Sequence, residues 1–348
     1  MVDQVVRTKQ ESGLTVLTAA GVVLVGYSYL FGLWTSRHGE SPDLLLTIRG
    51  WVNQPTGIGE DFGFLGIALL LLATGYVLSE AAKRLPAVQL LALLARTVLP
   101  VVVGAVLVST LLVLVGATPL TEPEDPSLSI WAVLANLWLV PRLFGQPSLI
   151  GLDAPVTAAF LFVLLLFAVL PLLQRPVIAS IVQLEVIGAL VLLGGWAGEV
   201  DAPSFLHELG LVAGYLPLLL IGQLAWMSRA GVLNVRIGVG LGALAWLLLV
   251  VHDRLFPELG GWWRPLGGAY AVLLLLIAVP RGASVADVAP VRWLASRALP
   301  LFFSIVVAGY AVLGLQSGWM PLVLAIPIAF AAAGLCAEGL HRAVGRFL

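Results

Sequence analysis

The chain has 348 residues, of which 60% are hydrophobic and only 11% are charged, and its formal net charge is -1 at pH 7. Its mean hydropathy is +1.04, whereas soluble proteins carry about 25% charged residues. This composition excludes a soluble globular protein, and the near-neutral charge argues against a nucleic-acid partner. The partner that it implies is a lipid bilayer.

Apolar runs of about 20 residues follow one another along the chain, and each is long enough to cross a bilayer as a helix. They predict an all-α integral membrane protein with about ten transmembrane helices and short interfacial helices. The first run is too long for a signal peptide and lacks a small-residue cleavage site, so it is expected to be retained. The predicted spans are 14–34, 62–79, 98–117, 155–174, 177–197, 205–227, 234–251, 266–280, 297–315 and 320–340.

These spans make a single transmembrane domain over 14–340, between an N-terminal tail (1–13) and a C-terminal tail (341–348). Basic residues concentrate in cytoplasmic loops, and ten spans with both termini cytoplasmic place most Lys and Arg on that side. The five left outside are Arg37, Arg49, Arg142, Arg254 and Arg264. The bias toward Ala, Leu, Val and Arg is typical of a high-GC bacterium, so we expect a multi-pass protein of a bacterial cytoplasmic (inner) membrane.

Three connections between spans are more than turns. The stretch 43–51 is short and amphipathic, and 83–96 carries basic residues at both ends of an apolar run, so each is predicted to be a helix in the membrane interface. The apolar, aromatic stretch 131–147 is expected to line an entrance or cap a cavity.

Two polar residues fall inside the fifth span. Ionisable groups there cost about 2.5 to 3.5 kcal/mol on insertion scales, so they are functional candidates by default. Glu185, two residues from Gln183, is interpreted either as a proton carrier or head-group ligand, or as a partner in a helix–helix hydrogen bond. Glu338, in the last span, has His341 and Arg342 on the same helical face, and an ion pair with structural function is expected there.

Two acid–histidine neighbours fall at the predicted outer side. His207 and Glu208 begin the sixth span, and His252 and Asp253 end the seventh. Adjacent residues on a helix point in different directions, so each side chain would need a partner from elsewhere to act as a catalytic base. Helix capping and solvated helix ends are the alternatives.

Metal and redox chemistry find no support in the sequence. The single cysteine, Cys336, excludes an intrachain disulfide. The four histidines, His38, His207, His252 and His341, show no metal-ligand spacing. No metal site and no cofactor is therefore predicted from the residues alone.

The stretch from Gly59 to Leu78 combines an acidic, glycine-rich start, with Glu60 and Asp61, and an apolar helix that carries Thr74-Gly75 near its end. Its core, from Gly66 to Leu78, is similar to the Gly-Val-x-Leu-Phe-Phe-x-Leu-Ser-Gly-Phe/Tyr-Leu-Ile segment of the acyltransferase-3 family. That family consists of ten-helix membrane enzymes that transfer acyl groups to sugars and other extracytoplasmic acceptors.

Further segments resemble the family in the same order. Among them are the arginine-bearing stretch that ends at Pro100, the Asn136-Leu137 segment and the helix from Tyr215 to Ala225. The resemblance covers almost the whole chain. It implies the family's fold and, as acyl donor, acyl-CoA or a similar molecule.

Two departures concern the chemistry. The family carries an arginine in its first helix, thought to hold an anionic part of the acyl donor, and eleven positions later a histidine, taken as the base. Aligning Gly13-Leu14 with the family's motif places Thr15 and Gly26 there, and neither residue can act as a general base.

Three functions remain open at this point. The chain is a divergent acyltransferase that has recruited His207 or His252, or a pseudoenzyme that binds a lipid, a glycan or a partner protein without catalysis. The third is a transporter or flippase-like protein with Gln183 and Glu185 on its path. A transporter would be expected to show an inverted repeat, and the sequence shows none that is convincing.

Overall fold

The computed structural model describes residues 2–37, 43–59, 61–116, 129–172, 174–200, 203–257, 263–281, 283–315 and 320–345. Every described element of secondary structure is a helix. Within these residues, nine helical segments are long and apolar enough to cross a membrane, and one further apolar helix, α8 (Asp153–Ala168), is shorter. By length and composition the chain is thus an all-α, multi-pass membrane protein.

The long helices each correspond to a predicted span. They are α1 (Val2–Tyr27), α5 (Gly63–Arg84), α6 (Ala87–Leu114), α9 (Pro176–Glu199), α11 (Leu216–Arg229), α12 (Val235–Leu255), α13 (Trp263–Arg281) and α18 (Leu322–Gly345). The shorter α-helices are α2 (Trp34–Arg37), α3 (Asp43–Ile48), α4 (Gln54–Thr56), α7 (Ile130–Leu137), α10 (Ser204–Ala213), α14 (Ala283–Ala286), α15 (Ala289–Ser296), α16 (Ala298–Ser304) and α17 (Tyr310–Leu315). Single turns of other geometry are η1 (Ser28–Leu33), η2 (Arg49–Asn53), η3 (Arg142–Phe144), η4 (Leu170–Leu172) and η6 (Ile305–Gly309).

Several predicted spans are interrupted, the first of them by the π-helical turn η1 between α1 and α2. The sixth consists of α10 and α11, which meet at Gly214-Tyr215. Pro217 in the first turn of α11 has no N–H to bond the carbonyl of Ala213, which favours a break in the helix at this place. The ninth consists of α16, η6 and α17, where one π-helical turn connects two α-helical pieces.

The separate interfacial helix expected over 83–96 is wrong. Lys83 and Arg84 end α5, Leu85 is extended (φ -110°, ψ 138°), and α6 then runs unbroken as far as Leu114. Pro86, the N-cap residue of α6, disfavours helical backbone at Leu85 and so separates the two helices. The missing N–H of Pro100 is tolerated inside an apolar helix. The helix expected over 43–51 is present as α3 and η2 and continues through α4.

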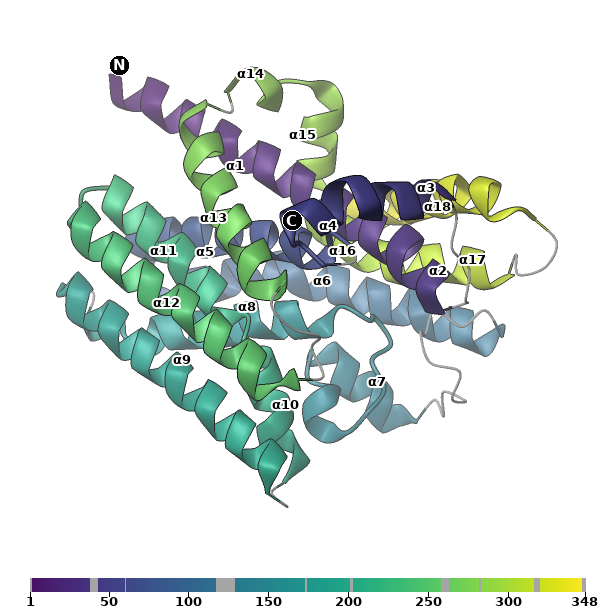
Figure 1. The fold of residues 1–348 in the computed structure, drawn as a ribbon, viewed down its shortest axis with the longest axis horizontal. Coiled ribbons are helices and arrows are strands. Elements are labelled where there is room, and N and C mark those ends of the chain that lie inside the picture. The colour runs from purple at the N-terminus through teal and green to yellow at the C-terminus, as the bar shows by residue number, and fades with distance from the viewer. Residues whose placement is uncertain are drawn as a thin grey trace.

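Helix α5 lies at the centre of the bundle and packs most extensively against α11 and α1. A Cβ on Gly66 would lie 2.7 Å from the carbonyl oxygen of Gly21 in α1, and one on Gly75 would overlap the carbonyl of Leu219 in α11. Small residues let the backbones approach this closely. In Figure 1, α9 and α12 run side by side along one edge, and α18 (yellow) lies on the opposite side of α5 and α6.

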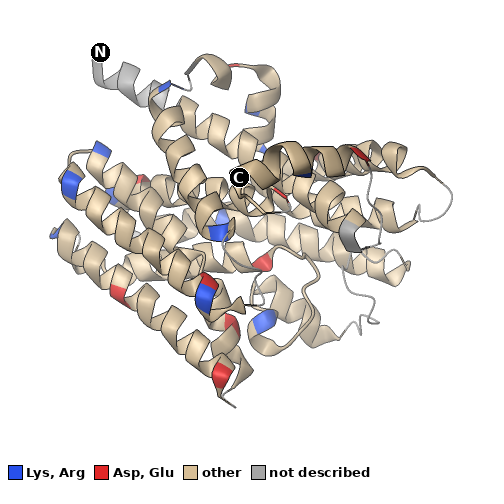
Figure 2. Cartoon of the chain, in the orientation of Figure 1, with Lys and Arg blue, Asp and Glu red and all other residues tan. Residues whose placement is uncertain are grey.

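The two ends of the bundle differ in charge. Lys83, at the end of α5, lies 5.8 Å from the ring of Trp226 near the end of α11, and Figure 2 shows further Lys and Arg where α11 leads to α12. We call this the basic end. At the opposite, mixed-charge end, α5 and α11 begin, with Phe64 and Tyr215 6.3 Å apart. Figure 2 shows acidic and basic residues together at this end of α12.

The glycine contacts give a first prediction. Gly75→Ala should lower the thermal unfolding midpoint of the purified protein, because the added methyl group forces α5 and α11 apart. Gly240→Ala is the matched control, because Gly240 lies in α12 with no atom within 4 Å of an added Cβ. There the gain in helix propensity, about 1 kcal/mol, should leave the midpoint unchanged or raise it. Equal midpoints for the two variants would contradict the prediction.

Candidate functional site

The two histidines predicted as alternative bases come together at the mixed-charge end. His207 of α10 and His252 of α12 both pack against Phe256, with ring centroids 5.1 Å and 4.5 Å away. Nδ1 of His207 lies 3.4 Å from the carbonyl oxygen of Gly194 in α9. Gly214 leaves the space that the His252 ring fills. The sequence does not predict this arrangement. It depends on the break between α10 and α11, which places Gly214 against His252.

The residues at the end of α12 are buried. His252 is 3% exposed and Asp253 is 6% exposed. Among the described residues, neither Nε2 of His252 nor Oδ1 of Asp253 has a hydrogen-bond partner. Buried polar atoms without partners are uncommon because each costs about 1 to 3 kcal/mol, so this end of the bundle is a candidate for a ligand or for ordered water.

A second polar group at the same end was not predicted as a site. Arg142 Nε lies 3.3 Å from Oδ2 of Asp153 at the start of α8, and the Ser148 hydroxyl donates to Oδ1 of Asp153 at 2.7 Å. Partial burial disfavours the charged form of Arg142, but Asp153 and Glu208 outweigh it and hold the pKa of the guanidinium above its ordinary value. Glu208 is thus placed in the field of Arg142, a partner distant in sequence.

The stretch 131–147, expected to line an entrance or cap a cavity, forms α7 and a folded loop. Fully buried Asn136 fixes the loop, because its Nδ2 donates to the carbonyl of Pro147 at 2.9 Å and its Oδ1 accepts from the backbone N–H of Leu149 at 2.8 Å. Thr157 of α8 donates to the carbonyl of Leu139, the only described non-glycine residue with a positive φ (61°). Side chains therefore hold this loop against α8.

The acidic start of the Gly59–Leu78 stretch has a structural function in the described part. Oδ1 of Asp61 accepts hydrogen bonds from the Ser28 hydroxyl at 2.7 Å and from the Gly63 N–H at 2.8 Å. Asp61 thereby satisfies a free N–H at the start of α5 and ties α5 to η1. Glu60 and His38 lie outside the described residues.

The polar residues predicted inside spans divide into two kinds. Gln183 of α9 is fully buried and exchanges two amide hydrogen bonds with Gln223 of α11, at 3.1 Å and 2.9 Å. Glu185, two residues on, is exposed on the outer face of α9. The two therefore face different surroundings and do not line a common path.

Glu338 forms the predicted ion pair with Arg342, at 2.8 Å. It forms a second one, which sequence spacing could not indicate, with Arg297 at 2.7 Å. The indole N–H of Trp293 in α15 donates to the same carboxylate at 3.2 Å. Glu338 thus connects α18 to α15 and to the start of α16 at the basic end.

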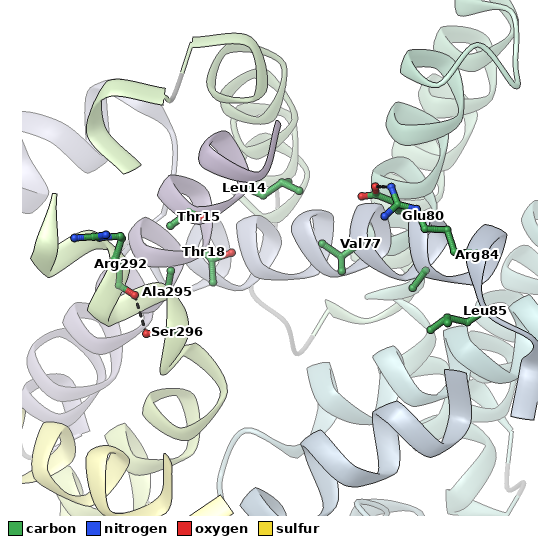
Figure 3. Close-up of a pocket in the computed structure, with 11 residues that line it drawn as sticks. Leu14, Thr15, Thr18, Val77, Glu80, Arg84, Leu85, Arg292, Ala295 and Ser296 are labelled. Carbon is green, nitrogen blue, oxygen red and sulfur yellow. Dashed lines mark hydrogen bonds and ion pairs between the residues drawn. The ribbon is translucent and has the colours of Figure 1, made fainter. Parts of the chain in front are cut away.

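The basic end also contains a groove of about 750 Å³ between α1, α5 and α15 (Figure 3). Its walls combine apolar side chains and hydroxyl groups, with charged residues at the margins. The lining residues are Leu14, Thr15, Thr18, Val77, Glu80, Ala81, Arg84, Leu85, Arg292, Ala295 and Ser296. Arg84 is paired with Glu80, and on the other margin Arg292 extends away from the centre of the groove in this view. Among the described residues, no carboxylate lies within 4 Å of Arg292.

The two positions aligned with the family's arginine and histidine have different surroundings. Thr15 lines the groove. Gly26 is buried, and a Cβ there would lie 2.8 Å from Cε1 of Phe330 in α18 and 3.5 Å from Cδ1 of Ile305 in η6. A histidine at position 26 would therefore meet apolar packing.

A scan against protein-family models, a search of curated proteins and a search of solved structures each find no match to this chain. The class that the fold defines is a multi-pass α-helical membrane protein. Among the described residues, no group of three or more His, Cys, Asp or Glu side chains could hold a metal ion.

The glutamine pair gives a second prediction. Gln183→Leu should lower the free energy of unfolding by about 1 to 3 kcal/mol, because it leaves the buried amide of Gln223 without a partner. Gln183→Leu combined with Gln223→Leu should recover part of this loss. Denaturation of the single and double variants, arranged as a double-mutant cycle, measures the coupling. Additive losses would show that the pair does not act as a unit.

Proposed function

We propose that this chain is an acyltransferase-3-like membrane protein that binds an anionic, acyl-bearing lipid in the groove between α1, α5 and α15, without transferring the acyl group by the family's first-helix chemistry. The observation that carries this proposal is the groove itself, with apolar walls and arginines at its margins.

The chemistry of the groove fits an amphiphile. Apolar side chains such as Leu14 and Val77 suit an acyl chain, whose burial contributes about 0.8 kcal/mol per CH₂. Two arginines against one glutamate leave an excess of one positive charge at the margins, and each Lys or Arg near an anionic membrane surface is worth about 1 kcal/mol. The groove lies where α5 ends, which is the depth expected for a lipid head group.

The lack of a histidine in α1, at the position where the resemblance would place the base, supports binding over catalysis. The hydroxyl of Thr15 has no basicity near neutral pH. Gly26 has no side chain that could act as a base. Phe330 and Ile305 pack against it and leave no room for a substrate hydroxyl.

A divergent acyltransferase is the second candidate. Its support is the imidazole of His252, which is buried with Nε2 unpartnered among the described residues and lies near the other predicted base, His207. The transporter alternative receives less support, because Gln183 is fully engaged with Gln223 and Glu185 points outward.

Lipid retention tests the groove. The full-length protein, extracted from membranes that contain phosphatidylglycerol and phosphatidylcholine, should retain phosphatidylglycerol preferentially in native mass spectrometry. Arg292→Gln should reduce this retention about fivefold, which corresponds to the loss of about 1 kcal/mol. Thr18→Trp should reduce it by filling the groove.

Arg236→Gln is the matched control, because Arg236 is an exposed arginine at the basic end outside the groove. If Arg236→Gln reduces retention as much as Arg292→Gln does, the groove is not the lipid site and only the general charge of the basic end matters.

Acyl transfer tests the absence of catalysis. Purified protein given a long-chain acyl-CoA and a sugar or water as acceptor should release no acyl product above a protein-free control, since α1 carries no histidine to serve as the family's base. His207→Ala and His252→Ala should leave this baseline unchanged. If the natural chain forms product, and a folded variant with either histidine substituted does not, the binding proposal is wrong and the protein is a divergent acyltransferase.

A further inference from the structure

The mixed-charge end contains an arginine that three aromatic rings hold in place. Cζ of Arg264, in the first turn of α13, lies 4.9 Å from the ring centroid of Phe64, 5.5 Å from that of Tyr215 and 5.8 Å from that of Trp263. Its Nη2 donates to the Tyr215 hydroxyl oxygen at 2.9 Å. The rings come from the start of α5, the residue before α11 and α13 itself, so the helices fix the guanidinium from several directions.

Most of the hydrogen-bonding capacity of this guanidinium is unused. An arginine has five N–H donors, and the bond to Tyr215 occupies one. Nε is buried and has no partner among the described residues. Tyr215 accepts the Arg264 bond through its oxygen, so its own O–H remains available to donate.

Arg264 forms no short-range ion pair among the described residues, although Asp253 of α12 is close enough to interact with it electrostatically. In the described part of the chain, no carboxylate lies within 4 Å of it. Arg142, by contrast, is paired with Asp153. The nearby α12 residues His252 and Asp253 are themselves buried with unpartnered atoms. An oriented, unpaired guanidinium beside a tyrosine hydroxyl is suited to bind an oxyanion through two parallel hydrogen bonds.

We propose that Arg264 and Tyr215 bind an oxyanion, a carboxylate or phosphate group, at the mixed-charge end. Aromatic rings around the cation lower its hydration and fix its plane, so little ordering is needed when the ligand arrives. This site lies at the opposite end of the bundle from the lipid groove and does not depend on it. The same chemistry is offered by a lipid head group and by a soluble anion.

The test titrates the full-length protein, in nanodiscs of phosphatidylcholine, with inorganic phosphate or acetate at constant ionic strength and follows the thermal unfolding midpoint. The midpoint should rise with the anion and saturate. Arg264→Gln should abolish the rise, and Arg264→Lys should weaken it at least tenfold by removing the planar fork. Tyr215→Phe should weaken it less. Arg254→Gln, at an exposed arginine of the same end, is the control and should keep the response.

A second arm separates the sources of the anion. If phosphatidylglycerol in the nanodiscs raises the midpoint of the natural chain and not that of Arg264→Gln, while free anions do nothing, the ligand is a lipid head group. A saturable response to free phosphate or acetate identifies a soluble anion. The proposal is overturned if neither probe acts, or if Arg264→Gln responds like Arg254→Gln. Asp253→Asn removes a nearby negative charge and should strengthen anion binding.

Discussion

The close backbone approach of α5 to its two neighbours is the constraint on which the rest of the structure depends. Gly66 faces Gly21 of α1, and Gly75 faces Leu219 of α11, so backbone atoms meet where side chains would otherwise separate the helices. In a bilayer, apolar side chains gain little by leaving lipid for another helix, so such van der Waals contact contributes much of the association. The Gly66-to-Gly75 segment is therefore the packing centre of the bundle.

Because the centre of the bundle is tightly packed, both candidate binding sites lie at its ends. Gln183 and Gln223 satisfy each other inside the bundle, and Asp61 is used to hold the start of α5. At the basic end the groove opens between α1, α5 and α15, and the Glu338 network holds α15 against α18. At the mixed-charge end the groups around Arg264, His252 and Asp253 remain incompletely bonded.

These two ends suit different ligand chemistry. The groove combines apolar walls with charge at its margins, as an amphiphile requires. Arg264, held by three aromatic rings, offers N–H groups of fixed direction, which favours binding of a planar or tetrahedral oxyanion over an apolar chain. Gly26 belongs to neither site, and Phe330 packs against it. Because position 26 is filled by this packing, the proposed lipid binding does not involve the histidine chemistry that the acyltransferase-3 resemblance implies.

Hydrophobic run length determined the membrane class and the approximate limits of the spans, because the thickness of a bilayer fixes how long an apolar helix must be. Spacing along one helix also predicted the Glu338–Arg342 pair. Helix breaks and long-range partners needed the tertiary structure. The contacts of His207 and His252 with Phe256, and those of Arg264 with its aromatic rings, join residues from different helices. The break at Leu85 and the continuation of α6 through the stretch predicted as interfacial were likewise visible only in the structure. Periodicity within one segment carries no information about which face of another segment it will meet, and that pairing decided both candidate sites.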